Sequence, residues 1–128
     1  MKYTVHILSF ILLLSSCSDL NQESGSGTSV KMPELIDYNI HVKPIFSDRC
    51  FTCHGPDKAN QKAGLALFES ESAYSELKEN PGHFAIIPGK IEKSEVINRI
   101  MTTSEEKMMP PPESNLKLSN YEKDLITK

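Results

Sequence analysis

Two cysteines and a histidine lie together in the stretch Cys-Phe-Thr-Cys-His at residues 50–54. The whole chain contains only 3 cysteines and 4 histidines, so this grouping calls for a chemical explanation. Thiols and an imidazole at this spacing serve four kinds of chemistry. These are a structural zinc site, a thiol–disulfide redox pair, a structural disulfide, and the covalent attachment of haem.

The neighbouring sequence favours haem attachment over the other three. A structural zinc site usually takes four ligands from two separated pairs, and the remaining cysteine, Cys17, belongs to an N-terminal signal. A redox pair is expected at the start of a helix in a βαβ unit, whereas a Gly-Pro pair follows this motif. A plain disulfide leaves the histidine without a role. Covalent attachment of one haem c uses all three residues, with thioethers at Cys50 and Cys53 and with His54 as the proximal iron ligand.

A second axial ligand is predicted in the Lys-Met-Met-Pro-Pro-Pro stretch at residues 107–112. The proline after Met109 restricts that residue to extended or polyproline backbone, and the run of prolines stiffens the next residues of the chain. A rigid loop of this kind holds a thioether against iron at little cost in entropy, so we predict Met109 as the distal ligand. Met108, His41 and His83 remain alternatives. The plainer interpretation is a surface turn whose methionines pack on the core.

The N-terminus has the pattern of a bacterial lipoprotein signal. Lys2 supplies positive charge, a mostly apolar stretch runs from Val5 to Leu14, and Leu-Ser-Ser-Cys ends at Cys17. The apolar stretch is too short to cross a hydrocarbon core of ~30 Å as a helix. The pattern predicts cleavage before Cys17 and a diacylglyceryl group on its sulfur; the alternative is an ordinary secretory signal with an incidental cysteine. In both cases we expect an exported chain, and with the lipid one anchored to a bacterial membrane, facing the periplasm or the cell surface.

Three parts are predicted along the chain: a signal peptide at 1–16, a lipidated cysteine with a flexible tether at 17–36, and one folded domain at 37–128. Ser, Gly, Asn and Gln dominate the tether, which has no apolar periodicity and a mean reach of about 25 Å. The composition, 38% hydrophobic and 24% charged, fits a small soluble domain. A formal net charge of −3 argues against nucleic-acid binding, which calls for a basic patch.

The first helix of the domain is predicted between Asp37 and Cys50. Asp37 is a suitable N-cap, and Pro44 either starts the helix or kinks it. Side chains at spacings of three and four residues give one apolar face. That face consists of Val42, Ile45 and Phe46, followed by Arg49.

The middle of the domain reads as short elements joined by turns. A short apolar stretch at 63–68 is followed by one or two helical turns at 70–77. Gly and Pro mark turns at 80–82 and 88–89. A second apolar face then runs over 91–101, with Ser94 near its start. It consists of Ile91, Val96, Ile97, Ile100 and Met101.

A capping box predicts the start of the last helix. Ser119 at the N-cap and Glu122 three residues later have the required types and spacing. Such a helix has run only about two turns when the sequence ends at Lys128. We therefore expect a mostly α domain, a small c-type cytochrome fold around one covalent haem, with its last helix truncated.

These motifs, in their order and spacing, resemble the planctomycete-type cytochrome c domain from about residue 37 to the end. The segments that carry the resemblance are Asp37-Tyr38-Asn39, Val42-Lys43-Pro44-Ile45, Cys50 to Asp57, Lys62-Ala63-Gly64-Leu65, Ile87-Pro88-Gly89, Lys93-Ser94, Arg99-Ile100 and Met109-Pro110-Pro111-Pro112.

The resemblance implies roles for four residues. It implies haem attachment at Cys50 and Cys53, proximal ligation by His54 and distal ligation by Met109. It also implies that the chain is the N-terminal module of a longer exported protein, because domains of this family commonly precede further, poorly characterised ones.

Two functions compete for this chain. The first is a membrane-tethered cytochrome that carries single electrons through a His/Met-ligated haem to an unknown redox partner protein. The second is the haem-containing part of a larger enzyme or ligand sensor with an open sixth coordination site. No catalytic dyad or triad is visible in the segment itself, so any catalytic domain is expected beyond residue 128. Four basic residues near the haem motif offer a docking rim for an acidic partner, or simply a solvated face. They are Lys43, Arg49, Lys58 and Lys62.

Overall fold

The computed structural model describes residues 30–128. The predicted signal peptide, the lipidation site Cys17 and most of the tether lie outside the described residues. Lys31–Lys128 form one folded unit. Within the described range, no helix combines the length and the apolar character that crossing a bilayer requires.

The first helical segment begins at Asp37, as predicted. The Asp37 side chain accepts a hydrogen bond of 3.0 Å from the backbone N–H of Ile40 and caps the π-helix η1 (Tyr38–Val42). Helix α1 (Lys43–Arg49) follows without a break. Pro44 is the second residue of α1, so of the two predicted alternatives it lies at the start of this helix.

The middle of the domain differs from the prediction after helix α3 (Ser70–Tyr74), where a two-stranded hairpin forms. Helix α3 forms where helical turns were expected, but strand β1 (Glu76–Leu77) then pairs antiparallel with β2 (Asn80–Phe84). The turn predicted at 80–82 is wrong. Asn80 already belongs to β2 and pairs with Leu77, so the chain reverses at residues 78–79. Gly82, with φ of 85°, sits in the bulge of β2, and its N–H donates to the Glu76 carboxylate. The Pro-Gly pair therefore marks a bulge within the strand.

The second half of the domain contains three further helical elements before the last helix. They are the 3₁₀-helix η2 (Ile91–Lys93), helix α4 (Glu95–Met101) and the 3₁₀-helix η3 (Pro112–Ser114). The predicted turn at 88–89 is confirmed. Ser94 is buried. Its hydroxyl donates to the Lys90 carbonyl at 2.9 Å and accepts from the Ile87 N–H at 2.9 Å. The Ser94 side chain therefore stabilises the preceding loop and makes no capping hydrogen bond to α4.

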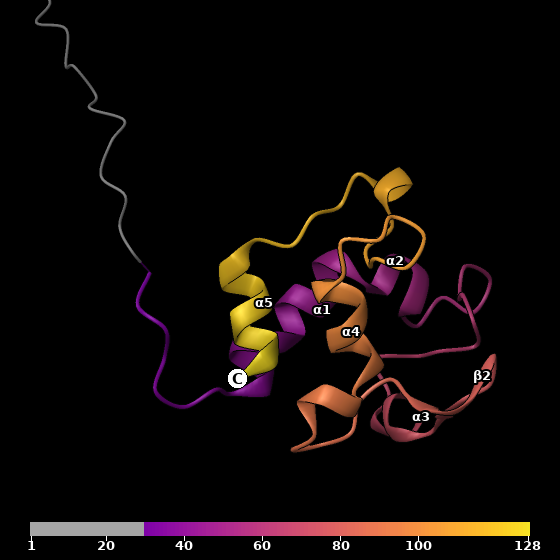
Figure 1. Cartoon of the computed structure of the whole chain (residues 1–128), viewed down its shortest axis with the longest axis horizontal. Helices are drawn as coiled ribbons and strands as arrows, with labels where there is room; N and C mark the ends of the chain where they lie inside the picture. Colours follow the sequence, from indigo (N-terminus) through magenta and orange to yellow (C-terminus); the bar gives the residue numbers. More distant parts are fainter. Residues whose placement is uncertain (1–29) are drawn as a thin grey trace, which may run out of the picture. The chain divides into compact units, whose positions relative to one another are not determined.

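The last helix, α5 (Asn120–Thr127), has the predicted capping box. The Ser119 hydroxyl accepts from the Glu122 N–H at 3.2 Å, and the Glu122 carboxylate accepts from the Ser119 N–H at 2.6 Å. Helix α5 packs against η1 and α4, which places both ends of the described domain close together (Figure 1). Lys128 reinforces this arrangement by donating to the Pro33 carbonyl at 2.6 Å.

The core lies between the first helices and the loops that return to them. Its buried cluster consists of Val42, Phe46, Leu67, Ala73 and Ala85. The apolar face predicted for the first helix is confirmed, because Val42, Ile45 and Phe46 are all buried. The second face is only partly correct: Ile100 is buried, but Ile91 and Met101 are 49% and 47% exposed. Helices dominate the domain and the sheet has only two strands, so the mostly α prediction is confirmed.

Candidate functional site

Cys50 lies at the junction of α1 and the short helix α2 (Phe51–His54). Its N–H donates to the Phe46 carbonyl at 2.8 Å and so closes the last turn of α1. The Cys50 carbonyl in turn accepts from the N–H of Cys53 at 3.1 Å and of His54 at 2.8 Å. One helical turn thus brings the two thiols and the imidazole together.

The loop after α2 returns to the end of this helix. The N–H of Lys62 donates to the Cys53 carbonyl at 2.8 Å, and the N–H of Leu67 donates to the His54 carbonyl at 2.8 Å. Carbonyls at a helix C-terminus have no intrahelical donor and need partners from elsewhere. The returning loop supplies them and thereby fixes the backbone of both predicted haem-binding positions.

Gly55 makes the sharp exit from α2 possible. It is buried, and a Cβ atom at this position would lie 2.3 Å from the Phe51 carbonyl oxygen and 2.7 Å from the Phe51 Cβ. No other residue type avoids this collision without a backbone shift. The glycine in Cys-His-Gly therefore has a steric role, whereas the sequence pattern indicates only a break in the chain.

His54 presents a half-buried imidazole, one nitrogen of which is buried and unused. Within residues 30–128 its Nδ1 is buried and has no hydrogen-bond partner. Burial lowers the pKa of His54, although the backbone of Leu65 and Lys62 opposes this shift. The imidazole is consequently neutral near pH 7, which is the form that binds iron.

The two cysteines are free thiols in the described domain and are half-buried. Burial, with a smaller contribution from Cys53, raises the pKa of Cys50 to about 11. A thiol–disulfide catalyst needs the opposite, because its attacking sulfur must be a thiolate at neutral pH. The environment of Cys50 therefore argues against a redox pair.

A zinc site is also unsupported by the donor set. Across the described residues, no group of three or more His, Cys, Asp or Glu side chains is arranged to hold a metal ion. Two thiols and one neutral imidazole on a single turn instead fit a haem, which takes two thioethers and one axial nitrogen. The residues present thus fit the covalent attachment of a porphyrin.

Met109, the predicted distal ligand, lies between α4 and η3. Its N–H donates to the Arg99 carbonyl at 2.9 Å, and its side chain is 38% exposed. Pro111 has the predicted polyproline backbone, with φ of −69° and ψ of 149°, whereas Pro112 already begins η3. None of these contacts tests whether the Met109 thioether binds iron, so its ligand role stays a prediction.

The three alternative ligands have local partners. The His41 Nδ1 accepts from the Asp37 N–H at 2.9 Å, and the His83 Nδ1 lies 2.9 Å from a Glu95 carboxylate oxygen. Met108 is less exposed than Met109, and its N–H donates to the Ser104 carbonyl at 2.9 Å. These contacts occupy only the Nδ1 atom of each histidine and so do not exclude either as a ligand. Of the two candidate methionines, Met109 is the more exposed.

The basic rim suggested by the sequence loses one member. The Arg49 guanidinium lies 3.2 Å from the Glu122 carboxylate and is engaged with α5. Lys43, Lys58 and Lys62 are exposed. A docking rim would therefore depend on lysines alone.

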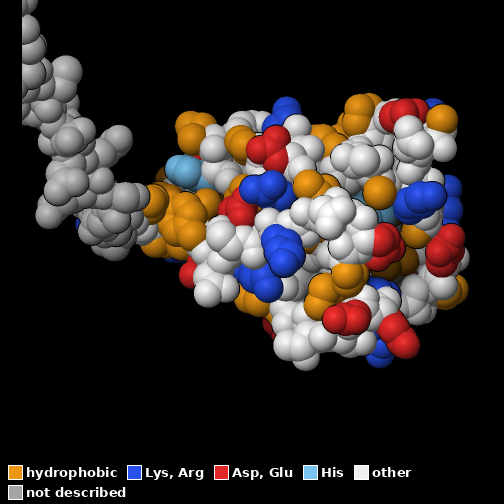
Figure 2. Space-filling view, turned by 90° about the horizontal axis from the view of Figure 1, so that it is seen from above, with side chains coloured by type: hydrophobic (Ala, Val, Ile, Leu, Met, Phe, Trp, Pro, Cys, Tyr) orange, Lys and Arg blue, Asp and Glu red, His pale blue; other side chains and the backbone are white. Residues whose placement is uncertain are grey.

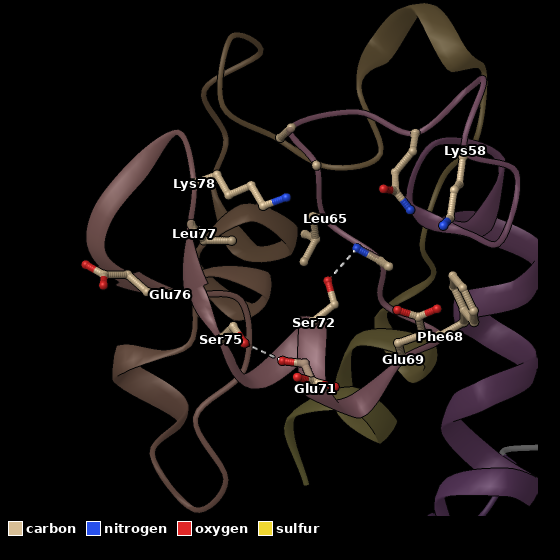
Figure 3. Close-up of a pocket in the computed structure, with 14 residues that line it drawn as sticks. Lys58, Leu65, Phe68, Glu69, Glu71, Ser72, Ser75, Glu76, Leu77 and Lys78 are labelled. Carbon is tan, nitrogen blue, oxygen red and sulfur yellow. Dashed lines mark hydrogen bonds between the residues drawn. The ribbon is translucent and has the colours of Figure 1, made fainter.

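A hollow of about 320 Å³ lies between the loop after α2, helix α3 and strand β1 (Figure 3). Leu65 and Lys78 point into the hollow, and Phe68 and Glu69 also line it (Figure 3). The Ser72 hydroxyl closes one wall by accepting from the Ala66 N–H at 2.9 Å. The cysteines of the motif and His54 are not among the residues that line this hollow, so it is separate from the candidate site.

Comparison with known proteins gives one match. A family model described as planctomycete cytochrome C matches residues 50–113, which is half of the 128-residue chain. The matched region begins at Cys50 and extends just beyond the three prolines. No curated protein and no solved structure matches the chain.

Proposed function

Because the chain belongs to the planctomycete cytochrome C family, we propose that its domain carries single electrons as a membrane-tethered c-type cytochrome. Membership of this family implies haem c as the cofactor. Bound haem supplies a one-electron Fe(II)/Fe(III) couple. The finer assignments of attachment, axial ligands and anchoring belong to the proposal.

The observation that carries the proposal is the turn from Cys50 to His54. Two free thiols and a half-buried imidazole lie on this turn, and the Lys62 and Leu67 N–H groups fix its end. In the proposal, the Cys50 and Cys53 thiols each add across a vinyl group of the porphyrin to form thioethers. The His54 imidazole binds the iron from one side.

The second axial ligand in this proposal is the Met109 thioether. Methionine opposite histidine raises the reduction potential above that of a bis-histidine site. The hydrogen bond from the Met109 N–H to the Arg99 carbonyl connects the loop that contains Met109 to α4. This bond limits the movement of the Met109 backbone. Limited movement suits electron transfer, in which both oxidation states keep the same ligands.

The location of the domain is proposed from the N-terminal signal. Lipid on the Cys17 sulfur would anchor the exported chain to a bacterial membrane, with the domain in the periplasm or at the cell surface. A redox partner protein would meet the domain there. We further propose that the domain is the N-terminal module of a longer exported protein.

Covalent haem is the direct test of the proposal. The exported protein, produced with a cytochrome maturation system, should keep its haem through denaturing gel electrophoresis and give a pyridine haemochrome spectrum of the c type. Cys50→Ala and Cys53→Ala should each leave one thioether and shift that spectrum, whereas Cys17→Ser should not. Correctly exported protein without covalent haem would refute the proposed function.

A second function, a haem enzyme or ligand sensor, is favoured by one observation. The Met109 side chain is 38% exposed, as expected if it left the sixth position open. Carbon monoxide distinguishes the two functions. Rapid binding to the ferrous wild type at micromolar concentrations would favour the sensor or enzyme, and resistance to binding would favour electron transfer.

A further inference from the structure

The first residues of the folded domain expose large apolar side chains to solvent. The exposed fraction is 83% for Leu35, 69% for Ile40 and 45% for Tyr38. We call these three residues the amino-terminal patch. Figure 2 shows hydrophobic side chains gathered at the end of the domain where the folded chain begins.

The fold holds this patch in place. Ile36 packs against the buried core cluster, so its neighbour Leu35 is directed outward. The Tyr38 ring packs edge-on against Phe46, with ring centroids 6.4 Å apart. The Ile40 backbone is fixed by its hydrogen bond to Asp37. These contacts fix the positions of Ile36, Tyr38 and Ile40 in the described domain.

The charges around the patch are balanced. Lys31 and Lys43 are exposed on either side of it in sequence, and Glu34 and Asp37 are exposed between them. A surface of this kind is not repelled by anionic lipid headgroups. Tyrosine is also suited to the boundary between water and lipid, because its ring is apolar and its hydroxyl is polar.

We propose that the amino-terminal patch rests on the surface of the membrane to which the domain is anchored. This inference depends on the lipid at Cys17 that is part of the proposed function. Residues 18–30 connect that lipid to the domain, and a chain of this length spans at most about 45 Å even when fully extended. The patch begins where this connection ends, so it is the part of the domain held nearest to the bilayer.

The short connection also explains why lipid is the occupant. A short linker gives an effective concentration on the order of millimolar, at which even weak contacts are occupied. A soluble protein partner has no such advantage. Three exposed apolar side chains with neighbouring lysines give the weak, reversible binding that is typical of interfacial segments. Docking would give the domain one preferred orientation on the membrane.

Orientation can be measured from the haem itself. In the lipidated holoprotein bound to flow-aligned liposomes of phosphatidylglycerol and phosphatidylethanolamine, the Soret band should show linear dichroism. Leu35→Asp combined with Ile40→Asp should reduce that signal by about fivefold or more, because two aspartates remove the apolar contact. Both proteins should still sediment with the liposomes through their lipid. The matched control is Ile91→Asp, which changes an apolar side chain of 49% exposure elsewhere in the chain and should keep the signal.

Each outcome bears on the inference separately from the proposed function. Absent dichroism in wild type with normal haem content and normal sedimentation would overturn patch docking alone. The same holds if the double variant keeps the wild-type signal. A wild type without haem absorbance, or one that fails to sediment, would refute the proposed cytochrome or its anchor and so remove the premise. Circular dichroism and thermal melting of each variant separate loss of docking from loss of folding.

Discussion

Arg49 and Glu122, which are 73 positions apart in the chain, form an ion pair of 3.2 Å between α1 and α5. Arg49 immediately precedes Cys50, and Glu122 also completes the capping box of α5 through Ser119. One carboxylate therefore both caps the last helix and fastens it to the helix that leads into the haem motif.

Removal of the two partners should have unequal effects on stability. Glu122→Ala loses both the capping contact and the ion pair, and it should lower the free energy of unfolding by about 1–2 kcal/mol. Arg49→Ala loses only the ion pair, whose arginine is a third exposed, and should cost at most about 1 kcal/mol. Guanidinium titrations of the holoprotein measure both values. Equal costs for the two variants would show that the capping contact contributes nothing.

The contribution of Glu122 should also depend on pH. Burial alone would raise the pKa of Glu122, but hydrogen bonds from Ser119 and Arg49 and the charge of Arg49 outweigh it, so the pKa lies below its ordinary value of 4.5. A lowered carboxyl pKa stabilises the fold above the unfolded-state value, and this stabilisation is lost as pH falls through the folded-state value. Wild type should thus exceed Glu122→Gln in stability at pH 7, and the gap should close below about pH 4.5. A gap that stays constant down to about pH 3 would contradict this linkage.

Gly55→Ala should destabilise the end of α2. The added Cβ would collide with Phe51, and relief requires a backbone shift that costs about 1–3 kcal/mol. Because the shift occurs next to His54, the yield of covalently loaded protein should fall as well. Gly82→Ala is the control: it meets no atom within 4 Å, its positive φ alone costs about 1 kcal/mol, and haem loading should be unchanged. Indistinguishable melting and loading of the two variants would remove the steric argument.

The choice between the two methionines is testable by spectroscopy. Ferric wild type should show the weak far-red absorbance of sulfur bound to iron, and Met109→Ala should abolish it and lower the reduction potential. Met108→Ala should do neither. If Met108→Ala removes the band instead, the ligand has been assigned to the wrong residue of the pair. If neither variant changes it, His41, His83 or an open site becomes the better assignment.

Cys17→Ser should move the exported protein from the membrane fraction to the soluble fraction and leave haem loading intact. The reason is that the predicted haem-attaching residues, Cys50 and Cys53, differ from the predicted lipidation site, Cys17. Fractionation after cell lysis, with the haem signal as the marker, measures the change. Identical fractionation of wild type and variant would contradict lipidation at this position.

Local signals in the sequence predict several elements correctly. The capping residues Asp37 and Ser119 indicate where a helix begins, because their side chains accept hydrogen bonds from backbone N–H groups only a few positions away. The hairpin of β1 and β2 is not predicted, since Pro81 and Gly82 are equally typical of a turn. A bulge and a turn use the same residue types, and only the partner strand distinguishes them.

The candidate site is predictable to different degrees. Cys50, Cys53 and His54 share one turn, so their spacing alone brings them together. The sequence places Arg49 in a basic rim because its partner Glu122 belongs to a distant helix and no local pattern reveals that pairing. The position of Met109 relative to His54 depends on the same kind of long-range packing, which a linear motif does not encode.

The hydrogen bonds from Lys62 to Cys53 and from Leu67 to His54 join one loop to the end of the haem motif. If the loop detaches, both carbonyls lose their donors together, and α2 loses its end at the same moment. Amide hydrogens of Lys62 and Leu67 should then exchange with solvent at a common rate set by that single opening event. Sequence changes in the loop would thus alter how long the motif stays accessible to the machinery that attaches haem, without touching either cysteine.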